Sequence, residues 1–203
     1  MRGAHDFSYS LRSQKIMAKY ILGKKIGMTT LYDKERGALN VTLIECEPNT
    51  ISVLRSTEKN GYSAVQLEIS KTKNKMHRKE FRLEKDAENE VGSKITVENF
   101  QVGDVVKVSG ITKAKGFQGV VKRHGFSGSP KSHGHKHDLR APGSIGAQQP
   151  QHVIKGKRMA GRMGGERATV KNMKVVYIDA VKNIIAIQGG IPGVVGRIVE
   201  IRG

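Results

Sequence analysis

The chain has 203 residues, with 36 Lys and Arg against 18 Asp and Glu, which gives a formal net charge of +18. This length allows one domain, or one domain with an insertion, and the positive charge indicates a polyanionic partner such as nucleic acid. A membrane is a weaker interpretation, because no apolar run approaches the ~20 residues of a spanning helix. Cys46 is the single cysteine, which excludes an internal disulfide and a cysteine-based zinc site; we expect it to be a small buried hydrophobe.

The first 69 residues divide into a leader and a series of short apolar runs. Residues 1–16 lack the apolar core of a secretory signal, and Met17 opens a sequence more typical of a protein N-terminus. We therefore expect residues 1–16 to be a disordered leader, or the start of translation to have been assigned too far upstream. Across residues 20–69, four runs of β-forming residues are separated by polar turns, and Asn60-Gly61 is a strong turn signal. Short strands at this spacing predict a small barrel or sandwich.

Residues 71–99 differ from the runs on either side. Their charges are of mixed sign and their apolar residues are thinly spread, which predicts an inserted subdomain with some helix and a solvated face. Residues 100–111 then return to β character, with Gly103-Asp104 as a turn.

Residues 113–174 have the most unusual composition in the chain. They contain 14 Lys and Arg, 2 acidic residues, 5 His and 11 Gly, and so hold +12 of the net charge. A segment with few large apolar residues and much backbone freedom cannot easily build a core. Phe117 to His124 is typical of a short helix that Gly125 ends, whereas residues 127–151 predict an irregular loop. We expect this segment to be disordered in the free protein and to become ordered against RNA.

From Val170 the β pattern resumes. Residues 175–178 and 184–187 flank a turn and predict a hairpin. We therefore expect a mainly β protein with a barrel, a small inserted α+β subdomain and a long, irregular, basic extension. The expected bounds are 17–112 plus 170–203 for the barrel domain, 71–99 for the inserted subdomain and 113–169 for the extension.

Enzyme motifs are weak in this chain. Residues 161–165 lack the spacing of a dinucleotide-binding loop, and residues 23–27 lack the Lys-Ser/Thr pair that completes a phosphate loop. The alternative to a binding protein comes from an H-x-H-x-H-D run, His133, His135, His137 and Asp138, which could ligate a transition metal. Neighbouring cations disfavour a metal there, and imidazoles that stack on bases or bond to phosphates are the preferred interpretation. A free RNA-binding protein or a metal-dependent RNA-modifying enzyme that uses the His run stays open as the alternative function.

The basic residues suit RNA better than duplex DNA. They are scattered among glycines and do not lie on one helix face, so the chain offers no recognition helix for a major groove. Glycines let backbone N–H groups approach phosphates, Arg supplies bidentate and stacking contacts, and Lys supplies point charge. The same charge would also suit a solvated basic tail, or a protein that condenses nucleic acid without specificity. The return to β structure at Val170 argues against a tail.

Five segments carry a family resemblance in order and spacing. They are GKKIGMT at 23–29, KGFQGVVKR at 115–123, SHG at 132–134, RAPGSIG at 140–146 and KGKRMAGRMG at 155–164. From about Lys19 to the C-terminus the chain resembles large-subunit ribosomal protein three, the universal L-three family, of bacterial type. The resemblance implies a translation-protein-type β-barrel whose long extension threads large-subunit rRNA and approaches the peptidyl-transferase region.

The resemblance also implies a function, partners and a location. The implied role is that of a structural constituent of the large ribosomal subunit, which binds rRNA and aids assembly without catalysis and without a cofactor. The resemblance implies neighbouring large-subunit proteins as partners and implies no binding to membranes or DNA. The implied location is the ribosome in the cytoplasm.

The residues expected to bind rRNA lie in the extension. They are Lys115, Lys122, Arg123, Arg140, Lys155, Lys157, Arg158, Arg162 and Arg167, with His133, His135 and His137 as contacts at the tip. Some bacterial members of the family carry a methylated Gln just after the Ser-Ile-Gly run. Gln149 is the matching position, and a glutamine methyltransferase is then an implied partner.

Overall fold

The structure is a computed structural model that describes residues 19–72, 74–84 and 90–203, so the leader expected at residues 1–16 lies outside the described residues. The described chain is mainly β, as the sequence predicts. In chain order the elements are β1 (Tyr20–Asp33), β2 (Gly37–Glu45), β3 (Asn49–Arg55), α1 (Thr57–Asn60), β4 (Ala64–Thr72), β5 (Lys75–Arg82), β6 (Lys94–Ile95), η1 (Val97–Asn99), β7 (Val105–Ile111), β8 (Phe117–Gln118), α2 (Val120–His124), β9 (Gly161–Arg162), β10 (Arg167–Asp179), β11 (Ile184–Gln188) and β12 (Ile198–Arg202).

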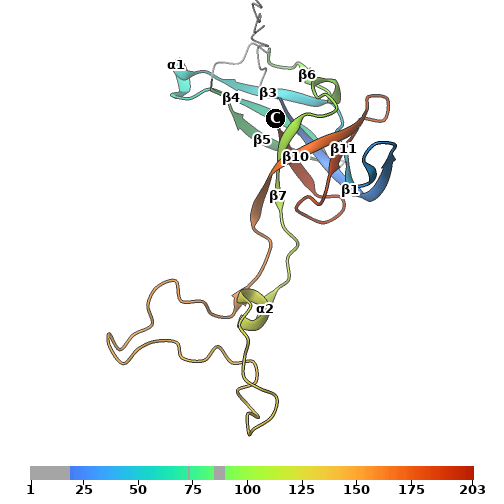
Figure 1. Ribbon diagram of the computed structural model, residues 1–203. Helices are drawn as coiled ribbons and strands as arrows, with labels where there is room; N and C mark the ends of the chain where they lie inside the picture. Colours follow the sequence, from blue (N-terminus) through green and yellow to red (C-terminus); the bar gives the residue numbers. More distant parts are fainter. Residues whose placement is uncertain (1–18, 73, 85–89) are drawn as a thin grey trace, which may run out of the picture.

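A closed barrel forms the body of the molecule (Figure 1). Its strand order is β1-β12-β7-β10-β11-β2, and every neighbouring pair is antiparallel. The predicted hairpin is confirmed as β10 and β11, with Ile178 opposite Ile185. Cys46 lies fully buried in the barrel core, also as predicted, and burial followed by the charge of Glu45 raises the pKa of its thiol.

The first part of strand β1 is buried on both faces, because the barrel lies on one side of it and a second sheet on the other. Ile21 packs into the barrel core, whereas Tyr20 and Leu22 pack among the side chains of the second sheet. The ring of Tyr20 stacks on Phe81, with 5.4 Å between the ring centroids. A strand segment covered on both faces needs a continuous apolar run, which explains the four consecutive buried residues at the start of β1.

The second sheet has the order β5-β4-β3-β6 and corrects two expectations. The apolar runs around Ile51 and Val65 were expected in the barrel, but they form β3 and β4 of this sheet. Among the described residues of 71–99, the expected helix is limited to the 3-10 turn η1, and the other residues form the end of β4, β5, β6 and the turns between them.

Cross-strand ion pairs explain why the mixed charge of this region was misinterpreted. Glu68 on β4 lies directly opposite Arg78 on β5, and their side chains form an ion pair of 2.8 Å. Arg55 on β3 reaches Glu80 on β5 at 2.9 Å. Opposite charges stabilise neighbouring strands as they stabilise successive helix turns, so mixed sign alone does not distinguish the two structures.

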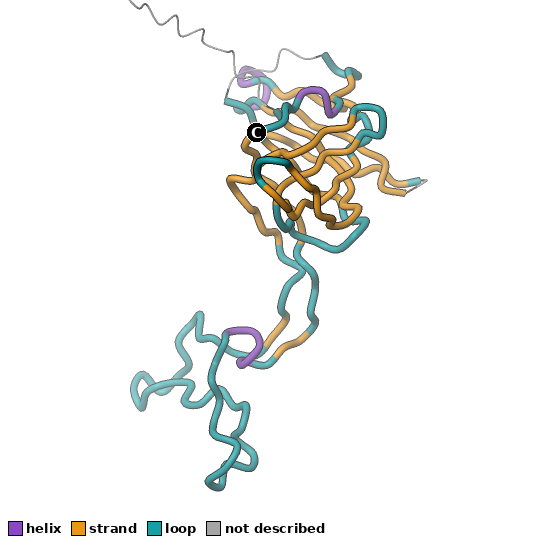
Figure 2. Tube along the Cα trace, turned by 45° about the vertical axis from the view of Figure 1, so that its right-hand side comes forward, coloured by secondary structure: helices purple, strands orange, loops and turns teal. Residues whose placement is uncertain are grey.

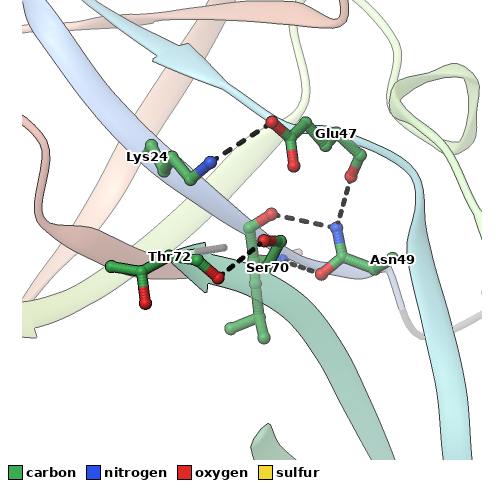
Figure 3. Close-up of polar contacts among 6 residues, drawn as sticks. Lys24, Glu47, Asn49, Ser70 and Thr72 are labelled. Carbon is green, nitrogen blue, oxygen red and sulfur yellow. Dashed lines mark hydrogen bonds and ion pairs between the residues drawn. The ribbon is translucent and has the colours of Figure 1, made fainter. Parts of the chain in front are cut away.

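Asn49 connects the second sheet to the barrel (Figure 3). Its side chain is fully buried, and its Oδ1 accepts a hydrogen bond of 3.2 Å from the backbone N–H of Leu22 on β1. Its Nδ2 donates to the carbonyl oxygens of Leu22 at 3.0 Å and Glu47 at 2.8 Å. One side chain thus satisfies three backbone groups where the chain leaves the barrel.

We expect Asn49→Ala to lower the free energy of unfolding by about 2–3 kcal/mol, because three buried backbone groups lose their partner. Urea unfolding of the full chain, followed by circular dichroism, measures this loss. Ser70→Ala is the control: its hydroxyl donates to the Thr72 carbonyl at 3.4 Å in an exposed position. Equal losses for the two variants would contradict a special role for Asn49.

Candidate nucleic-acid interface

The basic extension leaves the barrel through a neck, in which two segments, residues 112–118 and the returning residues 161–166, pair with each other. Strands β7 and β10 end their barrel pairing with Ile111 opposite Arg167. The two limbs then stay together, because the N–H of Thr112 donates to Glu166 at 2.9 Å and the N–H of Lys115 donates to Met163 at 2.9 Å. Strands β8 and β9 continue the pairing. Figure 1 shows both limbs extending away from the barrel side by side, so the neck holds the rest of the extension at a distance from the body.

Gly164 is required where the two limbs of the neck approach each other. Its φ is +71°, in the left-handed region that side chains disfavour, and a Cβ at this position would collide with the carbonyl oxygen of Lys113. Residue 164 on the return limb must therefore be glycine.

The short helix predicted for Phe117 to His124 is confirmed over Val120–His124 as α2, whereas Phe117 and Gln118 form β8. Helix α2 ties the two limbs together beyond the neck. Gly125 adopts the left-handed conformation and its N–H donates to the Val121 carbonyl. Arg123 Nη1 donates to the carbonyl oxygen of Met159 at 2.8 Å, and the ring of His124 bonds to the same oxygen at 3.0 Å. The carbonyl of one residue on the return limb thus fixes the position of α2.

Residues 126–158 form the tip of the extension and contain neither helix nor strand (Figure 2). The irregular loop predicted for residues 127–151 is thereby confirmed. Isolated backbone hydrogen bonds organise the tip, such as Ser129 N–H to Leu139 at 3.1 Å and Ala141 N–H to Asp138 at 3.2 Å. These hydrogen bonds set the course of the backbone through the tip, but the tip has no packed core.

The structure places nearly all of the predicted contact residues on the surface of the extension. Of the nine basic residues predicted, eight are exposed along its length, from the neck to the tip, as are the three predicted imidazoles at the tip. They are Lys115, Lys122, Arg140, Lys155, Lys157, Arg158, Arg162 and Arg167, and His133, His135 and His137. A long exposed surface with this density of donors can contact many phosphates at once.

Two of the predicted contact residues already have partners within the protein. Arg123 is half-buried against the Met159 carbonyl. Arg167 forms an ion pair with Glu200 on β12, and Glu200 also pairs with Lys79 on β5 at 3.4 Å. Glu200 therefore joins the root of the extension, the barrel and the second sheet. Sequence analysis missed this role, because Glu200 lies 33 residues from Arg167 in an ordinary β run.

Lys25 is a second residue at the root that sequence analysis missed. It is buried, and its Nζ donates to the carbonyl oxygens of Ile191 at 3.0 Å and Gly193 at 3.2 Å. Burial, followed by the positive charge of Lys113 in the neck, lowers the pKa of Lys25. This lysine holds a glycine-rich loop against the end of the barrel from which the extension leaves.

The described part of the chain shows no grouping of metal ligands. Within them, no three His, Cys, Asp or Glu side chains come close enough together to hold a metal ion, and the three imidazoles of the His run are exposed. None of the helices within the described ranges has the length and apolar character that crossing a membrane requires. The interface is therefore defined by exposed cations and backbone on an extended arm.

A β-barrel body with a long basic arm has the architecture expected of a structural nucleic-acid-binding protein, and comparison with known proteins gives the family. Residues 64–183 match the profile of the family described as Ribosomal protein L3. The chain is 41% identical over 207 residues to the large ribosomal subunit protein uL3 of Thioalkalivibrio sulfidiphilus, which covers 92% of this chain and 97% of the relative. The chain belongs to the ribosomal protein L3 family.

Other bacterial relatives agree in name and extent. The uL3 protein of Prochlorococcus marinus subsp. pastoris is 43% identical over 201 residues, with 90% of this chain and 92% of the relative covered. That of a Roseiflexus species is 43% identical over 204 residues, with 92% and 97% covered. Membership of this family confirms the resemblance seen in the sequence. The chain is therefore a structural protein of the large ribosomal subunit and not an enzyme. Its location is the ribosome, which is cytoplasmic in bacteria.

We expect Gly164→Ala to open the neck, because the new Cβ meets the Lys113 carbonyl and φ is strained, at a combined cost of about 2 kcal/mol or more. Hydrogen exchange of the Lys115 and Met163 amides in the free protein should then accelerate about 30-fold. Gly119→Ala is the matched control, because its φ is −69° and nothing lies within 4 Å of the added atom. Unchanged exchange in Gly164→Ala would show that the limbs are not paired in solution.

Proposed function

We propose that this chain binds large-subunit rRNA through its extension, which inserts between rRNA helices, aids subunit assembly and supports the peptidyl-transferase region. The observation that carries the proposal is the arm itself, which extends away from the barrel and exposes eight of the nine basic residues expected to bind rRNA, together with Lys113, Lys131 and Lys136. Neighbouring large-subunit proteins are proposed as further partners of the barrel surface.

Charge supports this proposal. Residues 113–174 hold +12 with two acidic residues, so the arm repels itself unless an anion neutralises it. Where rRNA helices converge, their phosphates repel each other as well, and Lys and Arg between them lower that repulsion. The two polyelectrolytes therefore stabilise each other's compact states.

The bonding pattern of the arm supports the same role. The neck and α2 are fixed by hydrogen bonds between the limbs, whereas the tip has isolated bonds and no core. A segment of this kind gains its order from the surface that it contacts. His133, His135 and His137 enter the proposal as contacts of the tip with bases or phosphates.

Sucrose-gradient sedimentation of a cell lysate at moderate and at high salt tests the proposal. We expect the chain to co-migrate with the large subunit and to stay there at high salt, because an arm enclosed by rRNA cannot dissociate contact by contact. Phosphate contacts on the surface alone should weaken by about 10³–10⁵ between about 50 and 200 mM salt. A chain at the top of the gradient would contradict the proposal.

Charge variants of the tip test the mechanism. The triple variant Lys155→Gln, Lys157→Gln, Arg158→Gln should bind isolated large-subunit rRNA more weakly and flatten the salt dependence of log K by about 2 to 3, at 0.7–0.9 per lost phosphate contact. The control removes three charges from turns of the barrel, Lys34→Gln, Arg36→Gln and Lys182→Gln. An equal effect of both variants would indicate nonspecific attraction.

We propose Gln149 as a methyl acceptor for a glutamine methyltransferase. Its side chain is exposed at the tip, next to Pro150, where an enzyme could reach it before the arm enters rRNA. Mass spectrometry of peptides from ribosomes should show one added methyl group on Gln149 and none on Gln148. An unmodified Gln149 in native ribosomes would contradict this proposal.

A further inference from the structure

The tip of the extension lines an open pocket of about 830 Å³, within the size range of small-ligand sites. We call it the tip pocket; its lining includes His124, Phe126, His135, Asp138, Gly143 and Arg158. The lining combines aromatic rings, a guanidinium group and a carboxylate, which is the mixture that recognises a nucleobase and its phosphate.

Two segments of the pocket wall contact each other at one point. Gly128 has a φ of +73°, and a Cβ there would lie 2.5 Å from the Leu139 carbonyl oxygen, so the segments 124–129 and 138–143 meet backbone to backbone. Ser129 N–H bonds to the same carbonyl at 3.1 Å. On the opposite side, the bonds of α2 to the Met159 carbonyl hold the neighbouring Arg158 beside the pocket.

Two rings supply the pocket with a stacking surface. The rings of His124 and Phe126 lie with centroids 6.0 Å apart and planes tilted by 43°. Residues 113–174 contain one other aromatic side chain of the Phe, Tyr or Trp type, Phe117, which lies in the neck. An unpaired base can stack on such a ring whatever its identity, so the rings select for an unstacked nucleotide but not for a sequence.

Asp138 supplies the selectivity. It is one of two acidic residues in the basic segment, and no hydrogen bond or ion pair engages its carboxylate within the described residues. A carboxylate accepts hydrogen bonds only, so it repels phosphate and needs donors. Among the bases, guanine alone presents two adjacent donors on its Watson–Crick edge, the N1–H and the N2 amino group, which match the two carboxylate oxygens.

We propose that the tip pocket holds one unstacked guanosine nucleotide of the large-subunit rRNA, stacked on the ring of Phe126, with its Watson–Crick edge on the Asp138 carboxylate. Arg158 contacts the phosphate of the same nucleotide. This inference rests on the proposed function, since it names the rRNA element that the extension recognises: a bulge or loop from which a guanine is extruded.

Kethoxal, which reacts with N1 and N2 of unpaired guanine, tests the proposal in large subunits that contain the full chain. One unpaired guanine should be protected in the wild type, and its reactivity should rise about tenfold in Asp138→Asn and in Phe126→Leu, as expected for a lost bidentate or stacking contact. The matched controls are Glu166→Gln, the other acidic residue, and Phe117→Leu, the other aromatic residue. Both should leave that guanine protected.

The proposal is overturned if no single guanine responds, if many respond together, or if the controls expose the same guanine. Sedimentation of each variant separates this outcome from failure of the proposed function: all four should still migrate with the large subunit, and absence of the wild-type chain from that fraction would refute the rRNA role itself. Ultraviolet crosslinking of wild-type subunits needs no variant. It should join a peptide containing Phe126 to one guanine, and a crosslink to another base would also overturn the proposal.

Discussion

The antiparallel pairing of β7 with β10 is the constraint on which the rest of the structure depends. These strands close the barrel between β12 and β11, and they also send out the two limbs of the extension from adjacent points. The ends of a long insertion are thus held together by a ladder that the barrel core already stabilises. Because the entropy of loop closure grows slowly with length, a long arm costs the barrel little more than a short one. The ion pairs of Glu200 with Arg167 and Lys79 add a link from this root to the second sheet.

Sequence patterns predicted the parts of the molecule that local chemistry decides. The β10–β11 hairpin, the stop of α2 at Gly125, the turn at Gly61 and the burial of Cys46 all follow from turn residues or apolar runs. The second sheet was missed because its charged residues pair across strands, and an ion pair between Glu68 and Arg78 has the same sequence signature as a solvated helix face. Residue composition indicates that a segment is polar, but not which neighbour neutralises it.

The candidate interface shows the same limit. Glycine and lysine content predicted an irregular basic arm, and the exposure of its cations agrees. Which cations are free could not be predicted, because that depends on contacts between limbs: Arg123 bonds to Met159, 36 residues away, and Arg167 bonds to Glu200, 33 residues away. A basic residue that already has an internal partner positions the arm, and its unpartnered neighbours are left for an anion. The motif residues of a basic segment therefore divide into two roles that sequence alone does not separate.

The gradient of order along the extension has an energetic consequence. The neck and α2 are fixed by bonds between the limbs, so little conformational entropy remains to be lost there when a partner binds. The tip has few such bonds, and ordering it against a partner costs about 1–2 kcal/mol per residue, which must be offset by phosphate contacts and counterion release. A stiff neck presents the tip at a defined distance from the barrel, and an adaptable tip follows the surface that it meets. An arm that was rigid along its whole length could bind only in a cavity already formed in the polyanion. This arm can take shape together with the polyanion around it.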